Sequence, residues 1–326
     1  MTEPLLRVHD LHVHFPVRSK GAWPWQAPQR LKAVDGVSFT LLPGETLGVV
    51  GESGCGKSTL ARAIIGLVPV TAGSLRWQGR ELTGQAAKDW RTVRRYMQMI
   101  FQDPLASLNP RMTVGESIAE PLITFQPHLN RGEVRQRVWA MMERVGLLPS
   151  LVNRYPHEFS GGQCQRIGIA RALILEPELI ICDEPVSALD VSIQAQVINL
   201  LKALQRELGL ALVFIAHDLS VVRHISTRVL VMYLGHGVEL ADRQALYNNP
   251  KHPYTQALLS AVPVPDPDAE KTRRVQLLQG EPPSPLDPPS GCVFRTRCPL
   301  ADDECARAVP ELKGPAEHRV ACFKVE

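Results

Sequence analysis

The 326-residue sequence lacks a long hydrophobic run, a strong net charge and closely spaced cysteine pairs. Its longest apolar runs, such as LALVFIA and ELIIC, fall short of the ~20 residues that span a bilayer. The N-terminus MTEPLLRVHDLHVHF has no apolar segment typical of a signal peptide. We therefore expect a soluble, cytoplasmic protein. The net charge of +3 gives no reason to expect a nucleic acid as partner.

Short apolar strands alternate with helical patterns, which predicts an α/β fold with a mostly parallel sheet. Strands are expected at residues 5–15, at residues 46–50, and in LIICDE and LVFIAHD, and a helix in VSIQAQVINLLKALQREL. A surface loop is expected at residues 16–31, and a helical insertion is expected at residues about 104–165. Proline and charge concentrate after about residue 236, as in linkers and small irregular domains.

A phosphate-binding loop (P-loop, or Walker A motif) follows the strand at residues 46–50. The stretch GESGCGKST, residues 51–59, matches G-x-x-x-x-G-K-[ST] between a strand and a helix. Its glycines let successive amides wrap phosphates, and the helix end adds positive potential. Lys57 is expected to neutralise the β- and γ-phosphates, and Ser58 to offer its hydroxyl to Mg²⁺. The alternative is a glycine-rich turn with a chance lysine. Cys55 is assigned no chemistry of its own.

Polar side chains also end three other expected strands. Asp183 and Glu184 follow LIIC, and adjacent strand residues point in different directions. Asp183 is expected to hold the hydration shell of Mg²⁺, and Glu184 to orient or deprotonate the attacking water. The alternative places both in a surface turn. His217 is interpreted as a γ-phosphate contact rather than a turn or capping residue. Gln102 is expected to touch Mg²⁺ or the water.

The stretch FSGGQCQRIGIARAL, residues 159–173, resembles the signature motif of ABC-transporter ATPases, usually read L-S-G-G-Q. Phe159 replaces the leucine, and Cys164 stands where a basic residue is common. The P-loop, Gln loop, signature, Asp-Glu pair, SALD (residues 187–190) and His also follow that family's order. Ser160 precedes a helical pattern, so the backbone amides at the start of that helix are expected to form another site that suits an anion. The resemblance implies that this end binds ATP held by a second ATPase subunit, with SALD along the interface.

Phe15, about 36 residues before the P-loop, is the best candidate to stack on adenine. The alternatives are a core position for Phe15, or Trp23 or Trp25 as the stacking residue. The residues expected at ATP are Phe15, Gly51, Ser53, Gly54, Cys55, Gly56, Lys57, Ser58, Thr59, Ser160, Gly161, Gly162, Gln163 and Asp190. The expected catalytic residues are Glu184, His217 and Gln102, and the expected Mg²⁺ site comprises Ser58, Gln102 and Asp183.

Two further segments, FQDPLASLNPRMTVGESIAEPL and HPYTQALLSAVP, resemble dipeptide and oligopeptide importer ATPases. The similarity is nearest to the second ATPase subunit of the dipeptide importer. It implies a P-loop NTPase (ABC ATPase) core over residues 1–240, with the helical subdomain about 104–165 inserted, and a C-terminal extension over residues 241–326. It also implies ATP-driven peptide import at the cytoplasmic face of the inner membrane.

The implied partners are two transmembrane permease subunits, a second nonidentical ATPase subunit and an extracytoplasmic solute-binding protein. The helical insertion would dock a short coupling helix of a membrane subunit. Nickel, glutathione or another small solute is an alternative cargo. A soluble ABC ATPase of repair or translation is a rival class, but such proteins lack HPYTQALLSAVP.

Four of the seven cysteines lie near the C-terminus, at Cys292, Cys298, Cys305 and Cys322. Their spacing, C-x5-C-x6-C-x16-C, lacks the C-x2-4-C pairs of structural zinc sites. Iron–sulfur clusters accept wider spacing, because loops wrap the cluster. The resemblance implies a [4Fe-4S] cluster here. Zinc, or a metal-free group of packed or oxidisable thiols, remains an alternative, and either a structural or a redox-sensing role is open.

Overall fold

The computed structural model describes residues 3–18, 27–262, 276, 278 and 280–325. The chain divides into two compact units. Unit 1 comprises Met1–Leu41, Thr46–Gly84 and Ala216–Glu326, and unit 2 comprises Leu42–Glu45 and Gln85–Ile215. None of the helices in the described ranges is both long and apolar enough to cross a lipid bilayer.

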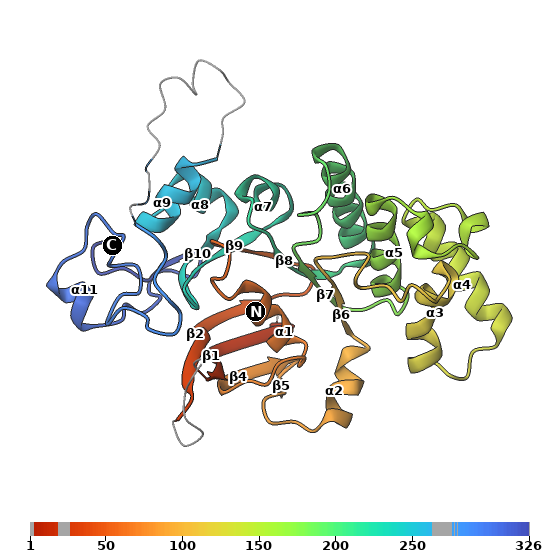
Figure 1. Cartoon of the computed structure of the whole chain (residues 1–326), viewed down its shortest axis with the longest axis horizontal. Helices are drawn as coiled ribbons and strands as arrows, with labels where there is room; N and C mark the ends of the chain where they lie inside the picture. The colour runs from red at the N-terminus through yellow and green to blue at the C-terminus, as the bar shows by residue number, and fades with distance from the viewer. Residues whose placement is uncertain (1–2, 19–26, 263–275, 277, 279, 326) are drawn as a thin grey trace, which may run out of the picture. The chain divides into compact units, whose positions relative to one another are not determined.

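Unit 1 contains a four-stranded antiparallel sheet in the order β2-β1-β4-β5 (Figure 1). Its strands are β1 (Leu6–Val17), β2 (Gln29–Leu41), β4 (Ala72–Trp77) and β5 (Arg80–Glu81). The expected loop at residues 16–31 is shorter than predicted. Pro16 pairs with Arg30 and Val17 with Gln29, so the β1–β2 ladder continues into both ends of that segment.

A second set of strands in unit 1 has the order β11-β10-β9-β3. The buried strand β3 (Thr46–Val50), predicted from its apolar run, lies parallel to β9 (Arg228–Tyr233). β9, β10 (His236–Asp242) and β11 (His318–Val320) are antiparallel neighbours. The helices of this unit are α1 (Lys57–Ile64), α7 (Leu219–Ile225), α8 (Arg243–Asn248), α9 (Pro253–Ser260) and α11 (Asp303–Arg307).

Unit 2 combines three parallel strands with a group of helices. β8 (Ala211–Ile215), β7 (Leu179–Asp183) and β6 (Met97–Ile100) pair in that order. β7 and β8 are buried along their whole length, as their uninterrupted apolar runs predict. The helices are α2 (Ala87–Arg94), α3 (Val114–Phe125), α4 (Arg131–Arg144), α5 (Gly161–Leu173) and α6 (Val191–Leu208), with 3₁₀ turns η1 (Pro149–Leu151) and η2 (Pro156–Glu158).

The predicted α/β class is therefore confirmed, with an antiparallel sheet added in unit 1. Helix α6 spans the predicted segment VSIQAQVINLLKALQREL, because Asp190 caps its first turn and Gly209 (φ 64°) ends it in the left-handed conformation. Helices α3, α4 and α5 all lie between β6 and β7 in the sequence; α3 and α4 fall within residues about 104–165, where the helical insertion was expected, whereas α5 continues beyond them to Leu173.

Candidate functional site

The P-loop joins β3 to α1 and depends on close backbone contacts. Gly51 (φ 152°) and Gly56 (φ 103°) both adopt conformations that residues with a Cβ rarely adopt. A Cβ at Gly51 would lie 2.1 Å from the Met232 carbonyl oxygen, and one at Gly56 would lie 2.0 Å from that of Ala33. Glycine is therefore required at both positions by packing as well as by conformation.

Lys57 is buried at the start of α1 and turns back into the P-loop. Its Nζ donates to the carbonyl oxygens of Gly51 (2.8 Å) and Glu52 (3.0 Å) and lies 3.8 Å from the Cys55 sulfur. Burial raises the pKa of the Cys55 thiol, and the Lys57 ammonium only partly opposes this rise. The thiol therefore stays protonated near neutral pH, consistent with a packing role.

The other P-loop residues differ in their exposure to solvent. Ser53 and Gly54 are exposed, whereas Ser58 and Thr59 in the first turn of α1 are half-buried. Phe15 in β1 is also half-buried, so it is not a fully buried core residue, and Trp23 and Trp25 lie outside the described residues.

His217 is exposed and directly precedes Asp218. The capping role that was the alternative for this histidine belongs to Asp218, whose carboxylate accepts a 2.7 Å hydrogen bond from the Ser220 amide at the start of α7.

In unit 2 the structure brings together two of the expected catalytic residues. The Gln102 amide Nε2 donates to Glu184 Oε2 at 3.1 Å, although 82 positions separate them in the sequence. Glu184 has a left-handed backbone (φ 47°), and its amide donates to the Ile215 carbonyl at 3.1 Å. Asp183, the last residue of β7, is only 1% exposed, so the surface-turn alternative does not fit it. The left-handed backbone of Glu184 is strained, and such strain concentrates at functional sites.

The signature segment forms the N-terminus of α5. Ser160 accepts from the Gln163 amide (3.3 Å), while Gln163 Oε1 accepts from the Ser160 amide (3.0 Å), which completes a capping box. A Cβ on Gly162 would lie 2.5 Å from Ile193 Cγ2 on α6, whereas one on Gly161 would meet only an ordinary contact with Leu189. The N-terminus of α5 therefore packs closely against that of α6.

The first turn of α6 is capped by Asp190, the last residue of SALD. Its carboxylate accepts from the Ile193 amide at 3.0 Å and from the Ser192 hydroxyl at 2.9 Å. The hydrogen bond from Ile193 lowers the pKa of Asp190, so the carboxylate is charged at neutral pH. Next to it, Val191 is 83% exposed. Two capped helix ends thus lie side by side on an accessible face of unit 2.

The four C-terminal cysteines are free thiols in unit 1, and Cys292 lies near enough to the other three to feel their charges. The Cys292 amide donates to the Cys305 carbonyl at 2.7 Å, and a Cβ on Gly291 (φ 66°) would lie 2.4 Å from that oxygen. Burial raises the pKa of Cys292, and the charges of Cys305, Cys298 and Cys322 raise it further. Burial and the neighbouring thiols have the same effect on the pKa values of Cys298 and Cys322.

These four thiols are near one another without being close enough for one small ion. Among the described residues, the group that is compact enough to hold a single metal ion lies elsewhere, at His12, His14 and Asp35. A tetrahedral zinc site with 2.3 Å Zn–S bonds needs sulfurs roughly 4 Å apart.

The histidine group was not anticipated from the sequence. Asp35 Oδ1 contacts His12 Nδ1 (2.7 Å) and His14 Nε2 (3.0 Å), and Lys32 Nζ donates to its Oδ2 (3.0 Å). His12 and His14 are two apart on β1, and Asp35 is the cross-strand partner of His12, so strand geometry puts all three on one face. The Lys32 ammonium already neutralises Asp35 and would repel a cation, so we assign an ion-pair network here.

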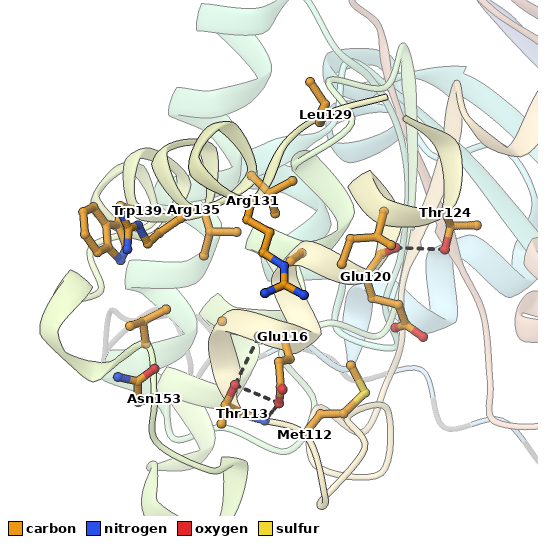
Figure 2. Close-up of a pocket in the computed structure, with 16 residues that line it drawn as sticks. Met112, Thr113, Glu116, Glu120, Thr124, Leu129, Arg131, Arg135, Trp139 and Asn153 are labelled. Carbon is orange, nitrogen blue, oxygen red and sulfur yellow. Dashed lines mark hydrogen bonds between the residues drawn. The ribbon is translucent and has the colours of Figure 1, made fainter. Parts of the chain in front are cut away.

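Helices α3 and α4 line a groove of about 760 Å³ in unit 2 (Figure 2). Its wall is largely apolar, and Ile123 and Trp139 are 60% and 39% exposed. Glu116 and Glu120 of α3 and Arg131 and Arg135 of α4 add charges of both signs, as Figure 2 shows. The Arg135 guanidinium lies 5.1 Å from the Trp139 ring centre.

Two residues that no motif singled out contact the P-loop within unit 1. Arg297 makes an ion pair with Glu52, and the Tyr254 hydroxyl accepts from the Glu52 amide at 2.8 Å. The only signals in the sequence were indirect, since Arg297 lies between two of the C-terminal cysteines and Tyr254 in HPYTQALLSAVP.

Comparison with known proteins places these features in context. Residues 34–187 match the family described as ABC transporter, and residues 238–305 match the Oligopeptide/dipeptide transporter, C-terminal region. The chain is 69% identical over 322 residues to the Oligopeptide transport ATP-binding protein OppF of Escherichia coli (strain K12), covering 99% of this chain and 96% of that one. It is 55% identical over 322 residues to the Oligopeptide transport ATP-binding protein AppF of Bacillus subtilis (strain 168), covering 98% and 97%.

Two solved structures of ABC proteins have a similar fold. A dimeric post-hydrolysis state of an ATP-binding cassette bound to ADP and Pi superposes with a TM-score of 0.65 at 26% identity, covering 73% of this chain and 98% of that one. The cbiO1 protein from Clostridium perfringens, part of an ABC transporter complex, superposes with a TM-score of 0.64 at 25% identity, covering 76% and 92%.

Proposed function

Because the chain belongs to the family of ABC-transporter ATP-binding proteins, we propose that it hydrolyses ATP to power the import of oligopeptides. The observation that carries this proposal is the match along nearly the whole chain to proteins named for oligopeptide transport, including the dedicated C-terminal region at residues 238–305. Within this family, the second ATPase subunit of the dipeptide importer is a second candidate for the role of the chain. The proposed domain boundaries are residues 1–240 for the ATPase and residues 241–326 for the extension.

Lys57 and Glu184 have the central roles in the proposed reaction. Lys57 neutralises the β- and γ-phosphates within the glycine-lined loop. Glu184, held by Gln102 at 3.1 Å, orients the attacking water and accepts its proton. Mg²⁺, when bound, neutralises charge on the phosphates, and Ser58, Asp183 and Gln102 have the oxygen atoms that it prefers. His217 contacts the γ-phosphate, and Phe15 stacks on adenine.

A second, nonidentical ATPase subunit completes the machinery in this proposal. One chain contains one P-loop and one signature segment, and the capped N-terminus of α5 suits an anion brought by another subunit. ATP binding would favour a closed pair of ATPases, and hydrolysis would release it. ATP must bind the closed state more tightly to drive this change.

The groove between α3 and α4 is proposed to hold a coupling helix from one of two membrane-embedded permease subunits. Its apolar wall fits the apolar face of a short helix, and Glu116, Glu120, Arg131 and Arg135 fit charges of both signs at its rim. The protein would then lie at the cytoplasmic face of the membrane, and a solute-binding protein on the other side would deliver the peptide.

The C-terminal thiols are proposed to hold a [4Fe-4S] cluster, supported by their convergence without the compact geometry of a single-ion site. The cluster would act as a covalent core for a segment with little apolar content. Anaerobic purification followed by iron, sulfide and zinc analysis tests this. Iron and sulfide in equal amounts support the cluster, whereas colourless protein with one zinc per chain contradicts it.

The cargo is tested by uptake of labelled di-, tri- and pentapeptides into cells lacking the chromosomal gene and complemented with variants. Wild-type chain should restore tripeptide and pentapeptide uptake, and Lys57→Ala should restore none, because it loses ATP binding. Restoration of nickel or glutathione uptake alone would contradict the peptide assignment. Unchanged ATP affinity in purified Lys57→Ala would contradict the assigned role of the P-loop.

A further inference from the structure

Glu52 places a carboxylate within the loop that is proposed to bind phosphates. A negative charge near that site disfavours a polyanion unless it is neutralised and directed away. Arg297 Nη1 and Nη2 donate to Glu52 Oε2 and Oε1 at 2.8 and 3.1 Å. The side chains of Arg297 and Glu52 are only 6% and 27% exposed, so water screens the pair weakly. The two hydrogen bonds hold the Glu52 carboxylate in one orientation and also neutralise its charge.

The backbone of Glu52 is held at the same time. Its amide donates to the Tyr254 hydroxyl at 2.8 Å, and its carbonyl accepts from Lys57 Nζ at 3.0 Å. Tyr254 is fully buried in α9, and its ring lies 4.8 Å from that of Tyr233 and 5.4 Å from that of Phe294. The second residue of the P-loop is thus fixed through its amide, carbonyl and side chain.

The position of Arg297 is set by the cysteine-bearing segment. The Arg297 amide donates to the Phe294 carbonyl at 3.0 Å, and Phe294 is 1% exposed within the aromatic cluster of Tyr233 and Tyr254. The Arg297 guanidinium also lies 5.9 Å from the Tyr233 ring centre. The loop between Cys292 and Cys298 therefore contributes one apolar anchor and one charged anchor to unit 1.

We propose that Arg297 is a positioning residue for ATP binding, because it neutralises Glu52 and holds the start of the P-loop in its binding conformation. The Cys292–Cys298 loop, 245 positions away in the sequence, thereby sets the ATP affinity of the P-loop. The inference rests on the proposed phosphate-binding role of the loop around Lys57. Through Glu52, the C-terminal extension would thus take part in nucleotide binding without contacting the nucleotide.

The test measures equilibrium binding of a fluorescent ATP analogue to the full-length chain. Arg297→Met should weaken binding on the order of 10-fold, because a partly buried carboxylate loses its partner beside the phosphates. Arg295→Met is the matched control. Arg295 lies in the same loop and donates to the Ser290 carbonyl at 2.8 Å, and within the described residues no hydrogen bond or ion pair joins its side chain to the P-loop.

A double variant separates electrostatics from general destabilisation. Glu52→Gln/Arg297→Met removes both charges and should recover most of the lost affinity, which a purely structural role for Arg297 would not produce. Equal binding by the Arg297→Met and Arg295→Met variants, or no recovery in the double variant, would overturn the proposal. If Arg297→Met does not fold, Arg297→Gln is compared with its Glu52→Gln double variant by the same criterion.

Failure of this inference can be told apart from failure of the proposed function. Lys57→Ala binding ATP as tightly as wild type would contradict the P-loop assignment itself. Loss of binding in Lys57→Ala, together with wild-type affinity in Arg297→Met, would contradict only the role of Arg297.

Discussion

At the scale of single residues, Glu184 combines a strained backbone with a specific partner. Its φ of 47° is unusual for a residue with a Cβ, and Gln102 holds its carboxylate. We expect Glu184→Gln to keep ATP affinity and to lower kcat by at least about 100-fold, because the amide cannot accept the proton. Phosphate release by the purified protein and its partners measures this. Glu207→Gln in α6 is the control, at a side chain that is 56% exposed and paired with Arg144. Wild-type turnover in Glu184→Gln would refute the role.

Asp35 gives a prediction about pH. Burial alone would raise its pKa, but hydrogen bonds from His12, Lys32 and His14 outweigh burial and lower the pKa to about 2, from 3.8. Because the folded-state value is the lower one, ionised Asp35 stabilises the fold above pH 4 by about 2 kcal/mol. This contribution is lost as the pH falls from about 4 towards 2.

The measurement is the thermal unfolding midpoint of wild type and Asp35→Asn between pH 7 and pH 3. The difference between the two proteins should stay constant from pH 7 to about pH 4 and shrink at lower pH, where Asp35 becomes protonated. Asp303→Asn, at a site 95% exposed, serves as the control and should unfold like wild type throughout. A constant difference for Asp35→Asn across this range would contradict the assignment.

At the scale of elements, helix α5 contains glycines with opposite expected effects. A Cβ on Gly162 would lie 2.5 Å from Ile193 Cγ2, whereas one on Gly168 would meet nothing within 4 Å. Gly168→Ala should therefore stabilise the fold by up to about 1 kcal/mol through helix propensity. Gly162→Ala should lower the unfolding midpoint and ATP turnover, because α5 and α6 must separate. Equal behaviour of the two variants would show that the helix ends are not tightly packed.

The elements also show what could be predicted and what could not. Strands β3, β7 and β8 are uninterrupted apolar runs, and helix α6 keeps one helical period throughout. The local sequence was therefore enough to predict them. The meeting of Gln102 with Glu184 follows from neighbouring parallel strands, whose carboxyl ends share an edge. The Arg297–Glu52 pair has no such pattern, because it depends on how an irregular C-terminal loop folds back.

At the scale of the whole molecule, the exposed groove on unit 2 predicts a partner. Ile123→Lys should reduce copurification with the proposed permease subunits severalfold, because a charge would be buried against the apolar face of the proposed coupling helix. Leu148→Lys is the matched control, since Leu148 is 65% exposed but does not line the groove. Affinity pull-down of the assembled transporter measures both. Equal recovery of permease with the two variants would exclude the groove as the docking site.

The division of the chain into units also governs how the protein is made. Unit 2 is complete in the sequence at Ile215, whereas unit 1 requires Ala216–Glu326 as well as the first segments. Strand β3 must wait for β9, and β10 for β11 at His318–Val320. At ~10 residues per second, a ribosome needs about 10 s more to supply them. The residues of unit 2 are therefore all made well before the P-loop acquires Tyr254 and Arg297, so on our proposal the nascent P-loop reaches its full ATP affinity only after Arg297 has been made.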